Sequence, residues 1–498
     1  MKVILAGYNI DSQVIEEARA AGVPAERLTP EVLSAAYARI SRNPAPVNEL
    51  RDAARNEVSS ARKSNRKIIF GMGHHSVAEH AVFNFDIIGL SRLAIEELEH
   101  FRLCSFTEKS QRYITLENDF VMPEELKNTP FATKLEALIA RQTEVYETLH
   151  KTLFKRLEQL HPDLVAKKSS RNMVDGWAKE DARYATLLCT AGQLGFTANA
   201  RNLELIIKRL NGAKLAELRD LGKRFYDTGT RVAPSILLFT APGSYELETP
   251  TVLKSIAQNA LKQEAAQAPS ADVSLVNCTP DADRITAAAM LCAASNVGFA
   301  ACLETARQMD DIALTQLYES AFSRMEFFDT PPREFEHVQL SFDISVSAAA
   351  FGQLKRHRMM SQSVQAYNTT LGLTVPPAIQ ECGMHDLFIR HAQQSEKLYS
   401  EIRSELPDVA PYVLTNAHRR RVLLTANLRD LYHFCRLRED AHAQWDIRVL
   451  AGQMRMEAEK VMPLGSLLLC GKDAFVDRFE TIFHRKPQID PANPPKNE

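Results

Sequence analysis

Two short segments of the chain alternate apolar and polar residues. Residues 82–87 read Val-Phe-Asn-Phe-Asp-Ile, and residues 338–344 read Val-Gln-Leu-Ser-Phe-Asp-Ile. A period of two points successive side chains to opposite faces, so both segments predict half-buried β-strands. The apolar residues 3–6 and 273–276 predict one further strand at the start of each half of the chain.

Longer stretches repeat apolar residues every three or four positions. Residues 131–159, 198–225 and 426–461 have this spacing, which predicts amphipathic helices. Only 19 of the 498 residues are glycine, which also favours a helix-rich protein. We therefore expect the α+β class, with many helices and a small antiparallel sheet in each half.

The same polar motifs occur twice, in the same order. Each half carries a Glu-His pair, then an Arg-containing segment about twenty residues later, and then Asn-x-Arg or its close equivalent. In the first half these are Glu79-His80, His100-Phe101-Arg102 and Asn199-Ala200-Arg201; in the second they are Glu336-His337, Arg356-His357-Arg358 and Asn427-Leu428-Arg429. The repetition predicts two related domains on one chain.

The boundaries of these domains follow from composition. We expect a first domain at 1–248, a weakly patterned Ala/Gln/Pro-rich linker at 249–271 and a second domain at 272–485. Residues 486–498 are rich in proline and charge, which predicts a disordered tail.

Charge and cysteine content narrow the class of protein. Lys and Arg number 60 against 62 Asp and Glu, so no excess of positive charge indicates nucleic acid or a membrane surface as a partner. The eight cysteines show no Cys-x-x-Cys spacing and indicate reduced thiols. No apolar run has the length of a membrane span, and the opening residues are too short for a signal peptide. These features predict a cytoplasmic protein.

A histidine-rich segment raises the question of a metal. On a helix, His75 and Glu79 would share one face, which is a possible ligand spacing. The second half keeps only Glu336-His337 of this segment, and a second cluster at ligand spacing is not evident. The ordinary interpretation is a structural helix start, and we predict no metal site.

Two charged segments are candidates for ligand binding. Arg356-His357-Arg358 follows an apolar helix and suits a phosphate or the polar edge of a flavin, although such runs are often solvated surface. Residues 105–113 combine a carboxylate, hydroxyls, a cation and an aromatic ring, which suits a planar anionic ligand such as a nucleotide. A plain polar loop is the alternative. Arg183, in Glu180-Asp181-Ala182-Arg183-Tyr184, either belongs to a helix cap or enters a site.

Taken in order, these segments resemble the flavin-dependent thymidylate synthases. That family carries Glu-His, then Arg-His-Arg followed by Ser and Arg-Tyr, then Glu-x-Ala-Arg-Tyr, Asn-Ala-Arg-Glu-Leu and Ala-Gln-Trp-Glu-Ile-Arg. The resemblance covers residues 28–235 and 272–465, so it spans most of both halves. Single motifs are weak, but six in order, twice, are specific.

The resemblance implies a fold, a reaction and an assembly. The family fold is α+β, and its homotetramer forms active sites at subunit interfaces. There FAD binds beside dUMP, methylenetetrahydrofolate supplies the carbon, NADPH is the reductant and dTMP is the product. With two copies on one chain, the resemblance implies a homodimer that forms a pseudo-tetramer.

Residue by residue, the first copy keeps the family's nucleotide segment. The resemblance assigns Glu108, Ser110, Arg112 and Arg183 to binding of the nucleotide substrate. His80, from the Glu-His pair, would lie near the flavin and folate and take part in catalysis. The first copy departs from the family where His100-Phe101-Arg102 replaces Arg-His-Arg.

The second copy keeps the flavin side instead. The resemblance assigns catalytic positions to His337 and Arg438, the latter near the nucleotide phosphate. It assigns five further residues to FAD: Arg356, His357, Arg358, Asn427 and Arg429.

This copy departs from the family at three positions. Val364 and Ala366 replace the Glu and Ser of the nucleotide segment, and Pro411 stands where the first copy has Arg183. The nucleotide motif is kept in the first copy and the flavin motif in the second, which suggests a composite site formed by residues of both copies. Two alternatives are a flavoenzyme acting on another nucleotide-like substrate and a non-catalytic nucleotide- or flavin-binding homologue.

Overall fold

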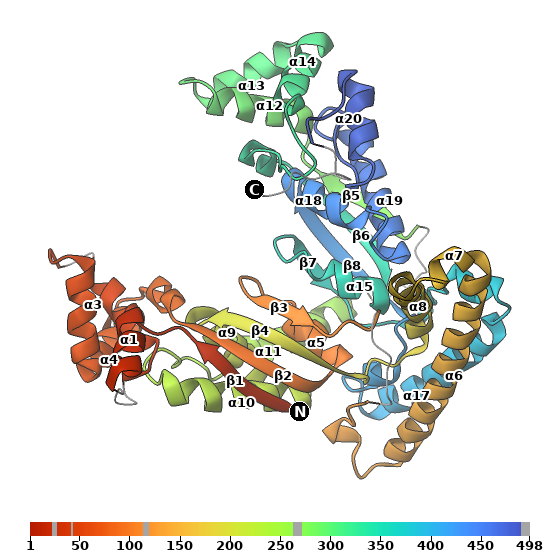
Figure 1. The fold of residues 1–498 in the computed structure, drawn as a ribbon, viewed down its shortest axis with the longest axis horizontal. Helices are drawn as coiled ribbons and strands as arrows, with labels where there is room; N and C mark the ends of the chain where they lie inside the picture. Colours follow the sequence, from red (N-terminus) through yellow and green to blue (C-terminus); the bar gives the residue numbers. More distant parts are fainter. Residues whose placement is uncertain (22–26, 41–42, 113–118, 262–270, 490–498) are drawn as a thin grey trace. The chain divides into compact units, whose positions relative to one another are not determined.

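The structure is a computed structural model that describes residues 1–21, 27–40, 43–112, 119–261 and 271–489. It divides into two compact units (Figure 1). The first contains the described residues up to 261 together with 376–415, and the second contains 271–375 and 416–489. Each unit is described by itself below.

The first unit is built on a four-stranded antiparallel sheet. Its strands are β1 (Lys2–Tyr8), β2 (Val82–Ser91), β3 (Ser105–Glu108) and β4 (Ala191–Asn199), in the order β1-β2-β4-β3. The buried face carries the apolar residues of the alternating pattern, and Phe85 lies opposite Phe196 in register with ring centroids 6.0 Å apart. The strands predicted at 3–6 and 82–87 are therefore confirmed.

The second unit repeats this sheet. Its strands are β5 (Val273–Cys278), β6 (Gln339–Ser347), β7 (Ser361–Val364) and β8 (Arg419–Asn427), in the order β5-β6-β8-β7. Phe342 and Leu424 are both buried and lie opposite each other. The pairing of the first strand is irregular in both sheets. The register of β1 against β2 shifts between Leu5 and Gly7, and that of β5 against β6 shifts between Leu275 and Asn277. The predicted tandem α+β repeat is confirmed by this shared topology.

Helices cover the first sheet and extend beyond it. Those before residue 262 are α1 (Ser12–Ala21), α2 (Glu31–Arg39), α3 (Val47–Asn56), α4 (Val58–Asn65), α5 (Arg92–Leu98), α6 (Pro130–Leu160), α7 (Pro162–Val165), α8 (Lys168–Ala182), α9 (Ala200–Asn211), α10 (Ala216–Val232) and α11 (Ser244–Ala260). Helix α6 matches the prediction for 131–159 and begins at Pro130, where the Thr129 hydroxyl accepts a hydrogen bond from the first turn.

The second unit has a similar set around its own sheet. These are α12 (Ala282–Ala293), α13 (Phe299–Gln308), α14 (Asp311–Phe322), α15 (Ala348–Leu354), α18 (Leu428–Arg438), α19 (Trp445–Val461) and α20 (Phe475–Phe483). A cluster of buried aromatic rings that includes Phe322, Phe335 and Tyr432 fills the space beside the sheet.

Two of the three long helix predictions were wrong in extent. The stretch 198–225 contains the end of β4 and two helices, because Gly212 closes α9 and a new helix begins at Ala216. The stretch 426–461 is divided between α18 and α19, where the side chain of Gln444 caps the second helix. In both cases the apolar spacing continues across a turn, so periodicity alone does not reveal the break.

One segment of the second copy belongs to the first unit. It contains α16 (Pro377–Glu381), α17 (His385–Glu405) and a 3₁₀ turn (Ala410–Val413). Helix α17 runs beside α6 (Figure 1), and the buried His391 ring bonds to the carbonyl of Ala185 at 2.8 Å. The compact units therefore do not follow the two sequence copies residue by residue.

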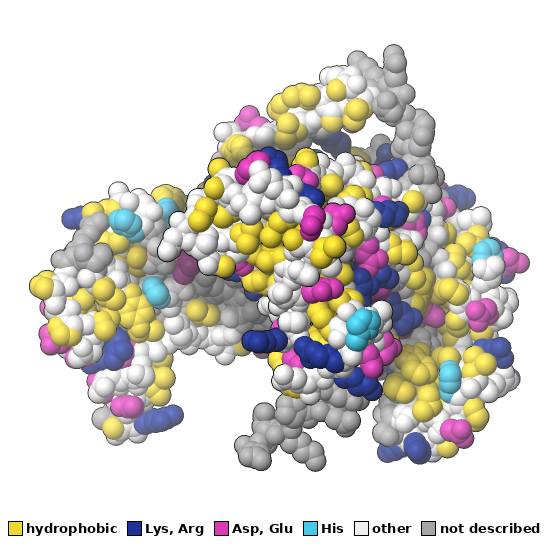
Figure 2. Space-filling view, turned by 90° about the horizontal axis from the view of Figure 1, so that it is seen from above, with side chains coloured by type: hydrophobic (Ala, Val, Ile, Leu, Met, Phe, Trp, Pro, Cys, Tyr) yellow, Lys and Arg dark blue, Asp and Glu magenta, His cyan; other side chains and the backbone are white. Residues whose placement is uncertain are grey.

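The expected linker and tail are only partly described. Most of 249–261 continues α11, whereas 262–270 and 490–498 lie outside the described residues. No helix among the described residues is long and apolar enough to span a membrane. On the face drawn in Figure 2, basic and acidic side chains are interspersed, in line with the near-balance of their numbers.

Candidate functional site

The predicted nucleotide segment begins with β3, an edge strand of the first sheet. Strand β3 ends at Glu108, and Ser110 and Arg112 follow directly. The Ser110 hydroxyl accepts the backbone N–H of Arg112 at 3.2 Å, which shapes the turn. Residue 113, the Tyr of the family motif, lies outside the described residues.

A buried arginine anchors Glu108. Arg92 opens helix α5, and its Nη1 donates to the two carboxylate oxygens of Glu108 at 3.1 and 3.4 Å. The side chain of Arg92 is only 6% exposed and that of Glu108 only 8%, so this ion pair is shielded from water. Glu96, one turn along α5, lies 3.6 Å from Arg92 Nη2. Arg92 was not among the site residues predicted from the sequence.

Arg112 and Arg183 meet at a second carboxylate. The Arg112 guanidinium forms an ion pair with Glu180, and Arg183 Nε donates to the backbone carbonyl of Glu180 at 3.2 Å. Burial is the main cause that lowers the pKa of Arg183, and the cations Arg112 and Arg92 lower it further. Arginine stays protonated even when it is buried. The three guanidinium groups and their carboxylates therefore form one charged cluster, in which Arg92 and Arg183 are buried and Arg112 is half-buried. The structure thus brings together Glu108, Arg112 and Arg183.

His80 has different neighbours. It ends a short 3₁₀ helix (His75–His80), it is exposed, and its ring packs edge-on against Tyr37 with centroids 4.6 Å apart. His337 ends the matching 3₁₀ helix (Arg333–His337) of the second unit and is also exposed. Both histidines therefore keep equivalent positions in the repeat.

The repeated motifs meet in each unit through the same ion pair. In the first unit, Arg201 Nη1 lies 2.6 Å from Glu79 Oε1; in the second, Arg429 Nη1 lies 2.9 Å from Glu336 Oε1. The Glu of Glu-His and the Arg of Asn-x-Arg are thus partners. Arg429 Nε also donates to the carbonyl of Pro331 at 2.8 Å.

The asparagines of the same motif are helix caps. Asn199 Oδ1 accepts the N–H of Asn202 at 2.9 Å at the start of α9, and Asn427 Oδ1 accepts the N–H of Asp430 at 2.7 Å at the start of α18. These bonds satisfy otherwise unpaired helix donors. A structural reason for Asn427 and Arg429 therefore exists beside their predicted contact with FAD.

In the second unit, a neutral histidine is held by an arginine. Arg438 Nε donates to His357 Nε2 at 2.9 Å, and Arg438 Nη1 donates to Gln353 Oε1 at 3.2 Å. Burial holds the pKa of His357 well below its usual value, and the nearby cation Arg438 and His433 lower it further. Because Nε2 accepts a bond, the ring proton of neutral His357 is on Nδ1.

The two arginines beside His357 are more accessible. Arg356 is exposed and Arg358 is half-buried, at the turn between α15 and β7. Gln362 Nε2 donates to the backbone carbonyls of Leu354 and His357 at 3.3 and 3.1 Å, which fixes this turn. The structure thus brings His357 to Arg438 and leaves Arg356 at the surface of the unit.

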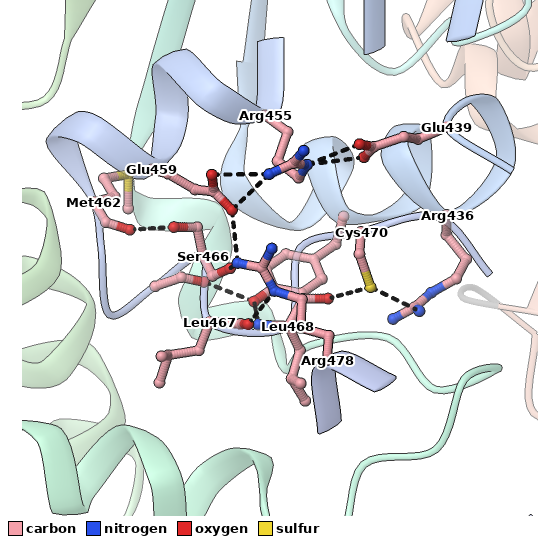
Figure 3. Close-up of polar contacts among 12 residues, drawn as sticks. Arg436, Glu439, Arg455, Glu459, Met462, Ser466, Leu467, Leu468, Cys470 and Arg478 are labelled. Carbon is pink, nitrogen blue, oxygen red and sulfur yellow. Dashed lines mark hydrogen bonds and ion pairs between the residues drawn. The ribbon is translucent and has the colours of Figure 1, made fainter. Parts of the chain in front are cut away.

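A network of ion pairs fixes the end of α18 that carries Arg438 (Figure 3). Glu439 accepts from Arg455 Nε at 2.9 and 3.1 Å, and Arg455 Nη1 donates to both carboxylate oxygens of Glu459 at 2.9 Å. Arg478, from α20, donates to Glu459 at 2.6 Å and to the carbonyl of Leu467 at 2.6 Å. These bonds link α18, α19, α20 and the loop between the last two helices.

A cavity of about 260 Å³ is lined in part by residues of the same helix. Three aromatic residues and two cations contribute to its lining, and Lys472 Nζ lies 5.1 Å from the centre of the Phe327 ring. Arg436 Nη2 is buried and has no hydrogen-bond partner among the described residues. The lining residues are Phe327, Phe328, Asp329, Thr330, Pro331, Tyr432, His433, Arg436, Leu437 and Lys472.

Comparison with known families agrees with the repeat. The family described as Thymidylate synthase complementing protein matches residues 25–235 and again residues 274–464. Together these matches cover most of the chain. The chain belongs to this family. It is a tandem form of the flavin-dependent thymidylate synthase family, and each of the two copies forms one of the two sheets.

Relatives of this family member fall into two groups. The chain is 27% identical over 444 residues to the UPF0159 protein of Chlamydia muridarum, a match that covers 85% of this chain and 82% of that protein. It is 31% identical over 160 residues to the flavin-dependent thymidylate synthase of Pyrococcus abyssi, covering 31% of this chain and 55% of that protein. A similar enzyme of Clostridium tetani is 27% identical over 218 residues, covering 43% of this chain and 83% of that protein.

Two solved structures are similar to part of the chain. The UMP/dUMP methylase PolB of Streptomyces cacaoi, bound with 5-Br dUMP, is 20% identical with a TM-score of 0.32; the match covers 44% of this chain and 100% of that one. The enzyme ThyX of Helicobacter pylori, complexed with FAD and dUMP, is 19% identical with a TM-score of 0.30, covering 47% of this chain and 100% of that one.

Proposed function

We propose that this chain is an enzyme that methylates dUMP to dTMP, with FAD as cofactor, methylenetetrahydrofolate as carbon donor and NADPH as reductant. One observation carries the proposal beyond family membership. The first unit keeps a cluster in which the buried Arg92 and Arg183 and the half-buried Arg112 alternate with carboxylates. Burial lowers the pKa of Arg183, and charged groups whose pKa is shifted in this way are concentrated at functional sites.

The chemistry of this cluster suits a uridine nucleotide. Glu108 is a hydrogen-bond acceptor, which matches an N–H of the pyrimidine ring. Guanidinium groups bind phosphate oxygens through paired hydrogen bonds, a role that suits Arg112 and Arg183. Because cations and carboxylates are both present, the cluster fits a ligand that offers a donor and an anion together.

The second unit offers groups that fit a flavin. We assign Arg356 and Arg358 to the phosphates of FAD and keep Asn427 and Arg429 as neighbours of the cofactor. The cavity beside α18 has aromatic walls, and the buried Nη2 of Arg436 is a donor that a ring nitrogen or carbonyl would satisfy. At about 260 Å³ the cavity suits one ring system and not a whole dinucleotide. Bound FAD would supply hydride transfer.

The residues around that group would act by position and charge. His357 is neutral and accepts from Arg438, so it keeps the Arg438 guanidinium oriented. We assign Arg438 to the nucleotide phosphate and His80 and His337 to the neighbourhood of flavin and folate.

Two chains would associate as a homodimer, which light scattering can measure. All eight cysteines are free thiols, which agrees with a cytoplasmic protein.

A second candidate is a homologue that binds these ligands without methylation. The observation in its favour is that each copy has lost part of the family pattern: His100-Phe101-Arg102 replaces Arg-His-Arg in the first, and Val364 stands in place of Glu in the second. Turnover distinguishes the two candidates, since both bind nucleotide and only one forms dTMP.

The test is an absorbance titration of the purified protein with FAD, with and without dUMP, followed by an anaerobic assay for dTMP. We expect a bound-flavin spectrum that shifts when dUMP is added. Glu108→Gln should weaken the response to dUMP, and Arg356→Ala should weaken FAD binding, whereas Arg224→Ala on the exposed face of α10 should change neither. Flavin binding that ignores dUMP contradicts the uridine substrate, and the absence of flavin binding contradicts the enzyme.

A further inference from the structure

A tyrosine from the second copy reaches into the first unit. Tyr412 is fully buried, and its hydroxyl donates to Glu217 Oε2 at 2.7 Å. Glu217 also accepts the backbone N–H of Ser91 at 2.7 Å and the Ser91 hydroxyl at 2.7 Å. One carboxylate thus receives three hydrogen bonds, two from the first copy and one from the second.

Ser91 connects this carboxylate to the candidate nucleotide site. It is the N-cap of α5, because its hydroxyl also accepts the N–H of Ala94 at 3.0 Å. The next residue is Arg92, whose guanidinium holds Glu108. A displacement of Ser91 would therefore move the first turn of α5 and, with it, the partner of Glu108.

The backbone makes a second connection between the same elements. Leu93 N–H donates to the carbonyl of Leu188 at 3.0 Å, and Leu188 N–H donates to that of Leu414 at 2.8 Å. Cys189 N–H donates to the carbonyl of Tyr412 itself at 2.9 Å. The first turn of α5 and the segment that carries Tyr412 thus lie on either side of one short stretch of chain.

The second unit has an acidic residue at the equivalent place. Ser347 caps α15 and donates its hydroxyl to Asp446 at 2.5 Å, as Ser91 does to Glu217. In both copies, the carboxylate that accepts the hydrogen bond from the cap serine comes from the second of two consecutive helices, α10 or α19, which follows the helix that begins with Asn-x-Arg. This recurrence indicates that the cap position matters to both sheets.

We propose that Tyr412 is a positioning residue for Glu108, so that the second copy sets the geometry of the nucleotide site in the first unit. The inference rests on the proposed function in one respect, namely that Glu108 binds the nucleotide. The phenol holds the Glu217 carboxylate toward Ser91, and Ser91 fixes the start of α5. Without the phenol, Glu217 can turn away, and the ion pair between Arg92 and Glu108 loosens.

The first arm of the test uses the ligand-free protein. Tyr412→Phe keeps the ring and removes only the hydroxyl. We expect hydrogen exchange in peptides covering 92–108 to accelerate by about tenfold, the change that one hydrogen bond to a charged group supports. The control is Tyr318→Phe, because Tyr318 is also fully buried and donates to a backbone carbonyl, that of Asp283, at 2.6 Å in the second unit. It should leave exchange at 92–108 unchanged.

The second arm measures dUMP affinity in a double-mutant cycle with Glu108→Gln. Tyr412→Phe should weaken binding about tenfold in the wild-type background and have no further effect once Glu108 is changed. A general loss of stability would instead weaken both backgrounds equally. Unchanged exchange at 92–108, or equal losses in both backgrounds, overturns the proposal. Faster exchange in a protein whose wild type does not bind dUMP leaves the positioning role standing and removes the proposed function.

Discussion

Arg438 donates its Nε–H to Nε2 of the buried His357 at 2.9 Å, and this bond requires a neutral imidazole. The two residues come from motifs 81 positions apart in the second copy. Their contact ties the Arg-His-Arg turn to the end of α18. A proton on His357 would place its imidazolium directly against the half-buried Arg438 guanidinium. Because these two cations would repel each other, we expect the stability of the second unit to decrease at acidic pH.

The first prediction concerns this pH dependence. The pKa of His357 is lowered in the folded protein, so below the unfolded value of about 6.5 the unfolded chain binds a proton that the folded one does not. The contribution of neutral His357 to the free energy of unfolding is therefore complete above about pH 6.5. It falls as pH decreases, by at most about 1.4 kcal/mol per pH unit. Urea unfolding between pH 8 and 5, followed by the fluorescence of Trp445 in a Trp177→Phe background, measures it.

His357→Gln should flatten this dependence, because Gln does not titrate. His484→Gln is the matched control, since His484 is exposed and lies in the same unit as His357 and Trp445. An equal slope in wild type and His357→Gln would show that the acid sensitivity arises from other groups.

The second prediction compares the two copies of one ion pair. In the first unit Arg201 is 52% exposed and its partner Glu79 is 39% exposed, so solvent screens the pair. Arg201→Ala should lower stability by no more than about 0.5 kcal/mol. Arg429 bonds to Glu336 and to the Pro331 carbonyl, so Arg429→Ala should cost about 1–2 kcal/mol.

Each variant has its own fluorescent reporter, because the chain has two tryptophans, Trp177 in the first unit and Trp445 in the second. Urea unfolding in a background that keeps only Trp177 gives the stability loss of Arg201→Ala. A background that keeps only Trp445 gives that of Arg429→Ala. Equal losses for Arg201→Ala and Arg429→Ala would mean that the carbonyl bond of Arg429 contributes nothing.

The repeat and the sheets could be predicted from the sequence, because both depend on local pattern. Alternation at 82–87 and 338–344 fixes which residues of β2 and β6 face the core. Their pairing partners β4 and β8 were not predicted as strands. The capping roles of Asn199 and Asn427 were also readable, since asparagine directly before a helix is a preferred cap. For Asn427, only a contact with the cofactor was predicted, although its capping role has a simpler basis in the sequence.

Other features depend on contacts that no local pattern encodes. Arg92 directly follows a strand and looks like an ordinary first residue of a helix, yet it is buried against Glu108. The apolar stripe of α17 predicts a helix but does not indicate that it packs beside α6 of the other copy. The cavity lining likewise joins Phe327, Arg436 and Lys472 from separate segments.

The last prediction concerns the loop that supports the end of α18. A Cβ on Gly471 would lie 2.8 Å from the carbonyl carbon of Glu439 and 2.9 Å from Asp473 Oδ1. Backbone atoms cannot yield as a flexible side chain does, so Gly471→Ala should push the loop away from Glu439, whose carboxylate binds Arg455. The expected cost is about 1–3 kcal/mol, with a weaker Arg438 contact to His357 as a consequence.

Gly298→Ala provides the control, because a Cβ there would meet nothing within 4 Å and its φ of −66° suits any residue. Thermal unfolding followed by Trp445 fluorescence compares the two variants. Ring-proton NMR of His357 reports whether its neutral tautomer persists in Gly471→Ala. If Gly471→Ala and Gly298→Ala unfold at the same temperature, the loop tolerates displacement, and the position of Arg438 depends on α18 alone.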